Sequence, residues 1–250
     1  MIERKEPIII SNTYCTWDSI NQCIVVNGVN FQGVIPTEEL GIPRINSGPI
    51  ISNVTPNNVP TPLDVLILLE KPFKVFVLRQ ENDKYIFSHK AYLEACKASL
   101  VVGEVYDAVI YSYCHWGAFC KIGDAPVLIY ITDWSICRFY NMQNVARIGN
   151  VEKVKIISKV VDKNGIRITA SRKAAAPIVK FNQGDTVVAT LGSLTDTNDG
   201  FFCEISPNTN AIVDVPPEKI NFLREGMRVV AYIRKISPRG YKLQYLQSLI

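Results

Sequence analysis

Residues 101–132 read VVGEVYDAVIYSYCHWGAFCKIGDAPVLIYIT, in which apolar runs alternate with short polar breaks. The runs at 105–110 and 127–131 are rich in Val, Ile and Tyr and are strand-sized, which favours β-strands over helices. Similar runs follow toward the C-terminus, at 151–160, 186–191 and 229–236. Many short strands separated by Gly, Pro, Asn and Asp are typical of small barrels and sandwiches, so we expect an all-β protein.

One segment, an apolar core followed by a Pro or polar stop, recurs at 33–40, 128–134 and 211–216. With Ile35, Ile129 and Val213 taken as equivalent positions, the spacings are 94 and 84 residues. Modules of this size have little core of their own, and closing five strands into a barrel removes exposed strand edges. The repeat therefore predicts three modules, at 1–97, 98–176 and 177–250.

Three other stretches complete the expected organisation. Residues 43–62 hold five Pro and four Asn between strand-like flanks, so we predict a long loop inside the first module. Residues 88–99 are the best helix candidate, because Ala, Leu, Glu and Lys dominate them. The connection at 174–180 is short and begins Ala-Ala-Ala-Pro, which is not a flexible composition, so we expect a semi-rigid array of modules.

Five ordered motifs run through most of residues 101–174. They are Val102-Gly103-Glu104-Val105-Tyr106, Trp116-Gly117-Ala118-Phe119, Leu128-Ile129-Tyr130-Ile131-Thr132, Ile148-Gly149 with 151–157, and 162–173. In this order they resemble the five strands of the S-one RNA-binding domain, an OB-fold barrel named after the largest protein of the bacterial small ribosomal subunit. The flanking modules match the family less well, at 31–36, 200–205 and 210–214. The resemblance implies three tandem five-stranded OB-fold barrels, of which the first is divergent and the third degraded.

The alternation of a pleated strand predicts which side chains of the middle module face outward. If Ala118, Cys120 and Ile122 point into the barrel, Phe119 and Lys121 point out. A glycine at position 117 permits a bulge or a close approach, which lets the preceding tryptophan share the outer face.

Trp116, Phe119 and Tyr130 are thus expected on one outward patch. Such a surface is costly unless it is covered, and a stacked nucleobase contributes roughly 1–3 kcal/mol. In the S-one family the matching patch binds single-stranded RNA, which implies RNA-binding roles for these three residues and for Arg167. The alternative for Trp116 and Phe119 is a buried core or a contact between modules.

The basic charge is concentrated in the middle module. The whole chain carries 27 basic and 23 acidic residues, a net charge of +4. The three predicted modules carry net charges of −1, +4 and +1 in chain order. We therefore expect phosphate contacts in the middle module. The candidates are Lys121, Lys163, Arg167 and Arg172.

The third module departs from the family at the same positions. Asp199 and Asp214 replace the aromatic and the His that the family pattern carries there, and both acids would repel phosphate. Phe202 remains, and packing is its expected role. The first module has no Gly-Ala-Phe motif. We therefore expect the flanking modules to act as spacers or protein-contact domains.

Several function classes find no support in the sequence. None of the seven cysteines forms a Cys-x-x-Cys pair and only two histidines occur, so we expect no metal site and no cofactor. No phosphate-binding loop, zinc-protease motif or nucleophile elbow appears, which argues against an enzyme. No signal peptide is apparent, and no apolar run reaches the ~18–20 residues of a membrane span, so we expect a cytoplasmic protein without a membrane partner.

The sequence thus predicts a non-enzymatic protein that binds single-stranded RNA with low sequence specificity, in translation or RNA metabolism. A ribosome or another RNA-processing protein is a further expected partner. One alternative is a scaffold whose barrels dock onto a ribosome, polymerase or nuclease. A second is binding of single-stranded DNA, which stacking alone does not exclude.

Overall fold

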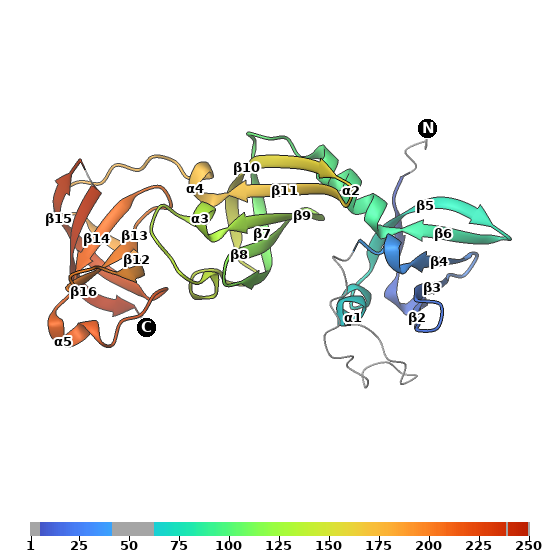
Figure 1. The fold of residues 1–250 in the computed structure, drawn as a ribbon, viewed down its shortest axis with the longest axis horizontal. Coiled ribbons are helices and arrows are strands. Elements are labelled where there is room, and N and C mark those ends of the chain that lie inside the picture. Colours follow the sequence, from blue (N-terminus) through green and yellow to red (C-terminus); the bar gives the residue numbers. More distant parts are fainter. Residues whose placement is uncertain (1–5, 42–62, 239, 250) are drawn as a thin grey trace. The chain divides into compact units, whose positions relative to one another are not determined.

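The computed structural model describes residues 6–41, 63–238 and 240–249. The chain is mostly β-strand, with short helices between three sheets (Figure 1). By its internal contacts it divides into two compact units, Met1–Cys96 and Lys97–Ile250. The predicted all-β class is confirmed, whereas the module boundaries after residues 97 and 176 stay predictions.

The first unit holds one six-stranded sheet in the order β1-β5-β6-β4-β3-β2. The strands are β1 (Ile8–Ile10), β2 (Cys15–Asp18), β3 (Cys23–Asn27), β4 (Gln32–Pro36), β5 (Phe73–Glu81) and β6 (Lys84–Ser88). Helix α1 (Leu63–Leu69) precedes β5, and the one-turn helices η1 (Asn12–Tyr14) and η2 (Thr37–Glu39) follow β1 and β4. Fully buried Ile24, Val26, Ile35 and Val75 centre its core.

In the first sheet two short strands, β1 and β2, take the place of the single long first strand of the other barrels. Strands β2 to β6 keep the strand order of the barrels described below, but within the described residues the sheet does not close. β1 pairs antiparallel with β5, from Ile8 beside Val75 to Ile10 beside Phe73, and β2 pairs with β3, just as the first and second halves of β7 pair with β10 and β8. The predicted loop at 43–62 lies outside the described residues.

The second unit contains two closed five-stranded barrels. The middle barrel consists of β7 (Val105–Cys114), β8 (Gly117–Ile122), β9 (Ala125–Tyr130), β10 (Val151–Asp162) and β11 (Gly165–Ser171). The third barrel consists of β12 (Thr186–Leu194), β13 (Gly200–Glu204), β14 (Asn210–Asp214), β15 (Arg228–Ser237) and β16 (Gly240–Leu249). In each barrel the fourth strand pairs with the first and the fifth runs parallel to the third, so one topology occurs twice.

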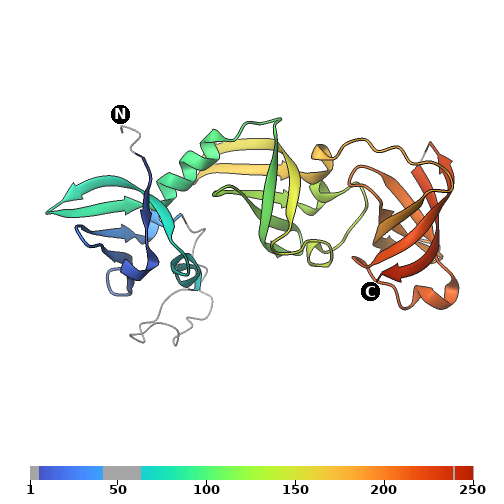
Figure 2. The ribbon, with the colours of Figure 1, turned by 180° about the vertical axis from the view of Figure 1, so that it is seen from behind.

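Short helices surround these barrels. Helix α2 (His89–Ser99) leads into the middle barrel and matches the predicted helix at 88–99. The others are α3 (Ile131–Trp134), η3 (Met142–Asn144), α4 (Arg172–Ala175) and α5 (Pro217–Ile220). Both views show the connection that leaves α4 running from the middle to the third barrel (Figure 1, Figure 2). Within the part of the chain that the structure describes, no helix has the length and apolar character of a membrane span.

Candidate nucleic-acid interface

Strands β8 and β9 build the surface on which the predicted site residues lie. They pair antiparallel, with Gly117 opposite Tyr130 and Phe119 opposite Leu128. Ala118, Cys120 and Ile129 are fully buried in the barrel, so Phe119 and Tyr130 face the other side of the pleat. The alternation that the sequence predicted in this hairpin is the one observed.

Three aromatic rings gather on that outer side, and we call Trp116, Phe119 and Tyr130 the aromatic platform. The Trp116 ring lies 5.8 Å from the Phe119 ring, edge to face, and 5.8 Å from the Tyr130 ring at an interplanar angle of 34°. Trp116 is 40% exposed and Tyr130 43%, whereas Phe119 is half-buried. The platform is therefore open to solvent and is not part of the barrel core.

The local sequence explains why Trp116 reaches this face. It occupies the two-residue turn between β7 and β8, where Cys114 pairs with Gly117. A Cβ atom at Gly117 would lie 3.0 Å from the Ile129 carbonyl oxygen, so the close approach expected at this glycine is present. The Trp116 carbonyl accepts a hydrogen bond from Ile131 N at 2.9 Å, which fixes the turn against the end of β9.

Basic side chains lie further along β8 and on the neighbouring strand β11. Lys121 is exposed two residues beyond Phe119 on β8, opposite Pro126 of β9. Strand β11 runs parallel to β9, and Thr169 of β11 lies beside Leu128 of β9. Arg167, which is exposed and precedes Thr169 by two residues, therefore lies at the level of Pro126. The outer face thus carries aromatic rings at one end and two cations at the other.

The two remaining predicted phosphate contacts differ from each other. Lys163 is exposed in the turn between β10 and β11, near Arg167 in the sequence. Arg167 itself forms an ion pair with Asp162 at 3.0 Å on the surface. Arg172 differs, because its guanidinium is mostly buried between Glu152 and Glu204, which leaves little of it exposed for the predicted RNA contact.

One residue near the platform was missed by the sequence analysis. Tyr111 is 43% exposed on β7, and the Lys121 ammonium lies 5.3 Å from the centre of its ring. Burial raises the pKa of the Tyr111 hydroxyl. Period-two alternation along β7, where Ala108 and Ile110 are buried and Val109 is exposed, could have revealed it.

The third barrel presents acids at the equivalent places. Gly200 pairs with Asp214 and Phe202 with Ile212, the same register as in the middle barrel. Asp214 lies 3.3 Å from the Lys242 ammonium, and the hydroxyls of Thr197 and Thr195 hold the pKa of Asp199 below its usual value. The departures from the family pattern that the sequence indicated therefore lie on the corresponding face.

The cysteines and acids of the described residues do not gather into a metal-binding cluster. Burial raises the pKa values of Cys120 and Cys137 to about 12, so both thiols are protonated at neutral pH. No group of three or more His, Cys, Asp or Glu side chains within the described ranges could hold a metal ion.

The chain is homologous to bacterial ribosomal proteins over 57% of its length. It is 31% identical over 156 residues to small ribosomal subunit protein bS1 of Staphylococcus epidermidis, covering 57% of this chain and 39% of that protein. It is 30% identical over 155 residues to the bS1 homolog of Bacillus subtilis, covering 56% and 40%. The chain thus spans about two fifths of the length of these relatives.

Among solved structures, a multidomain protein with nucleic acid binding domains from Streptococcus pneumoniae aligns over 96% of this chain and 72% of its own. Its sequence identity is 14% and its TM-score 0.34. No protein-family model matches the chain.

Proposed function

We propose that this chain, which is homologous to the bS1 proteins over 57% of its length, is a non-enzymatic RNA-binding protein. Its middle barrel binds single-stranded RNA with low sequence specificity, in translation or RNA metabolism. The observation that carries the proposal is the aromatic platform, in which Trp116 contacts both Phe119 and Tyr130 and the rings are open to solvent on a barrel with a basic surplus.

Stacking supplies the attraction for the bases. Trp116 and Tyr130 offer exposed ring faces, and each base stacked on such a ring contributes roughly 1–3 kcal/mol. Every base has a π-face, so this contact is tolerant of sequence. Phe119 supports the edge of the Trp116 ring and keeps it in place.

Phosphate contacts complete the proposed interface. Lys121 and Arg167 lie at one level of the outer face, and Lys163 occupies the adjoining turn. A strand whose bases stack on the platform would pass its backbone over these cations, and their neutralisation of phosphates makes binding salt-dependent. A ribosome or another RNA-processing assembly is the proposed setting.

Titration of fluorescent single-stranded RNA tests the proposal. Wild type is compared with Tyr130→Ala, with Trp116→Ala and with the double variant Trp116→Ala/Phe119→Ala. We expect saturable binding by wild type, weakened roughly 5–150-fold for each stack that is lost. The matched control is Tyr140→Ala, which removes a tyrosine that is 63% exposed but lies outside the platform.

Absence of saturable binding by wild type would refute the proposal, as would equal losses in Tyr130→Ala and Tyr140→Ala. A single-stranded DNA of the same sequence forms the second arm. Since stacking does not involve the 2′-hydroxyl, we expect DNA to bind by the same face, and preference for RNA is read from the ratio of the two affinities.

A further inference from the structure

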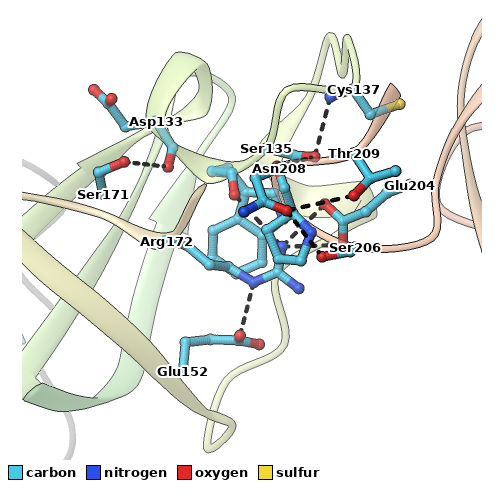
Figure 3. Close-up of polar contacts among 12 residues, drawn as sticks. Asp133, Ser135, Cys137, Glu152, Ser171, Arg172, Glu204, Ser206, Asn208 and Thr209 are labelled. Atoms are coloured by element: carbon cyan, nitrogen blue, oxygen red, sulfur yellow. Dashed lines mark hydrogen bonds and ion pairs between the residues drawn. The ribbon is translucent and has the colours of Figure 1, made fainter. Parts of the chain in front are cut away.

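Arg172 begins α4 directly after β11, and its guanidinium lies between carboxylates of two different barrels (Figure 3). Its Nε donates a hydrogen bond to Glu152 Oε2 on β10 of the middle barrel at 2.7 Å. Its Nη1 donates to both carboxylate oxygens of Glu204 on β13 of the third barrel, at 3.0 and 2.9 Å. Each barrel therefore contributes one counter-ion to the same cation.

This group is shielded from water. The Arg172 side chain is 17% exposed and that of Glu204 10%. The ring of Trp134 in α3 covers the guanidinium, with its centroid 4.7 Å from Cζ, and the Trp134 carbonyl accepts from Nη1 at 3.4 Å. In such surroundings, removing one partner leaves a buried charge uncompensated, so the contact resists opening.

Backbone hydrogen bonds cross the junction beside this cation. Ile136 N donates to the Pro207 carbonyl at 2.8 Å, and Ser193 N donates to the Arg138 carbonyl at 3.0 Å. The Ser135 hydroxyl adds a bond to Pro207 O at 3.3 Å. The segment 135–144, which follows α3, is thus bonded directly to β12 and to the turn before β14.

A second carboxylate holds the other end of the same segment. Glu225 of the third barrel accepts hydrogen bonds from Tyr140 N at 2.8 Å, from Asn141 N at 3.0 Å and from Asn144 Nδ2 at 3.0 Å. The connection between the barrels is held as well, because Asn208 Nδ2 donates to the carbonyl of Ala176 at 2.9 Å. The junction therefore has several attachment points well separated along the chain.

The cation lies where the strands of the proposed interface end. Arg172 follows β11, the strand that carries Arg167, and Trp134 lies in the helix that begins immediately after Tyr130. Tyr130 and Trp134, whose ring covers the Arg172 guanidinium, are thus joined by one helix of four residues, α3.

We propose that Arg172 is a positioning residue that clamps the middle and third barrels into one rigid two-barrel body and thereby holds the β9 end of the aromatic platform. The consequence for the platform rests on the proposed function, whereas the clamp does not. The planar guanidinium matters because it serves two carboxylates at once, which a lysine ammonium does with far less geometric control.

Two isosteric variants of the full chain separate the two halves of the clamp. Glu204→Gln removes the counter-ion from the third barrel, and Glu152→Gln removes the one from the middle barrel. We expect Glu204→Gln to speed hydrogen exchange at the Ile136 and Ser193 amides by about tenfold, because both amides bond across the junction. Glu152→Gln should affect these amides less, and neither variant should affect the β8 amides of the barrel core.

Unchanged exchange at Ile136 and Ser193 in Glu204→Gln would overturn the clamp. RNA binding by Arg172→Gln gives an independent reading. If Arg172 only positions the platform, the variant binds RNA more weakly but with the salt dependence of wild type. If the slope of log affinity against log salt falls by the amount of one phosphate contact, Arg172 binds RNA directly and the positioning role is wrong. If wild type binds no RNA, the proposed function fails, and the exchange measurement still decides the clamp.

Discussion

Arg167 is the residue whose phosphate contact is easiest to isolate. Its ion pair with Asp162 is on the surface, so its removal costs little stability. We expect Arg167→Gln to reduce the slope of log affinity against log salt by about 0.7, the value for one phosphate of a single strand. Lys153→Gln is the control, because Lys153 also pairs with an acid, Asp107, but lies on β10 away from the platform. Equal slopes in all three proteins would exclude a phosphate contact at Arg167.

Gly226 is required by the junction between the barrels. Its φ of +86° lies in the left-handed region, and an added Cβ would lie 2.1 Å from the Asn144 carbonyl oxygen. Gly184 has a similar φ of +92° with nothing within 4 Å of its Cβ position. We expect Gly184→Ala to lower the free energy of unfolding by about 1–2 kcal/mol, the cost of the left-handed backbone alone.

Gly226→Ala should lower the free energy of unfolding by more than Gly184→Ala does. The clash of its Cβ with the Asn144 carbonyl adds to the same cost of the left-handed backbone. Urea denaturation of both variants measures the difference. If the two substitutions are equally destabilising, the backbone around Asn144 yields without cost, and the close approach does not constrain residue 226.

Buried thiols give the protein a pH-dependent stability. Burial raises the pKa of Cys120 from its ordinary value of 9.0 to about 12. Below pH 9 the thiol is protonated in both states. Above it the unfolded thiol ionises first, so stability is lost as the pH rises toward 12. Between pH 9 and 10 we expect this thiol to lower the free energy of unfolding of wild type by about 1 kcal/mol. Urea titrations of Cys120→Ala over the same interval should lack this contribution. An unchanged pH dependence in Cys120→Ala would contradict this assignment.

At the scale of elements, β7 shows how alternation sets the energetics of a barrel strand. Ile110 is 1% exposed and its neighbour Val109 is 43% exposed. We expect Ile110→Ala to cost about 2–5 kcal/mol through lost burial and the cavity left behind, and Val109→Ala to stay within about 0.5 kcal/mol. Chemical denaturation of the two variants tests whether β7 keeps this orientation in solution. Comparable losses of unfolding free energy in Ile110→Ala and Val109→Ala would argue against this orientation of β7.

The same alternation explains how much of the interface could be predicted. Ala118 and Cys120 are buried while Phe119 and Lys121 face outward, as the sequence indicated, because a strand has only two faces. The expected third strand stops at Tyr130, and Ile131 instead begins α3. Local periodicity did not reveal this end, which depends on the contacts of α3 with the rest of the barrel.

Two features were beyond sequence reasoning because they depend on distant partners. Arg172 looked like a surface cation after a strand, and its counter-ions lie 20 and 32 residues away, one of them in another barrel. In the first sheet, alternation does not tell that β1 pairs with the distant β5 whereas β2 pairs with the neighbouring β3. Both outcomes are decided by long-range pairing rather than by local pattern.

For the whole molecule, charge predicts the strength of the salt dependence. The net charge of +4 is carried by residues 98–176, and three basic side chains remain as proposed phosphate contacts. Three contacts to a single strand give a slope of log affinity against log salt of about −2. Titration at several salt concentrations measures it. A slope near zero would mean that stacking alone holds the strand, and a much steeper one would indicate basic residues outside the middle barrel.

The pairing of the first and fourth strands also bears on how fast each barrel forms. In the middle barrel Val105 lies beside Lys155, 50 residues further along the chain, and the third barrel repeats the pattern with Thr186 beside Tyr232. Neither barrel can close before its long connecting segment has been brought into place, and chain entropy opposes that step. Folding should therefore be slow for domains of this size, in milliseconds to seconds, as is usual for all-β topologies rich in non-local contacts.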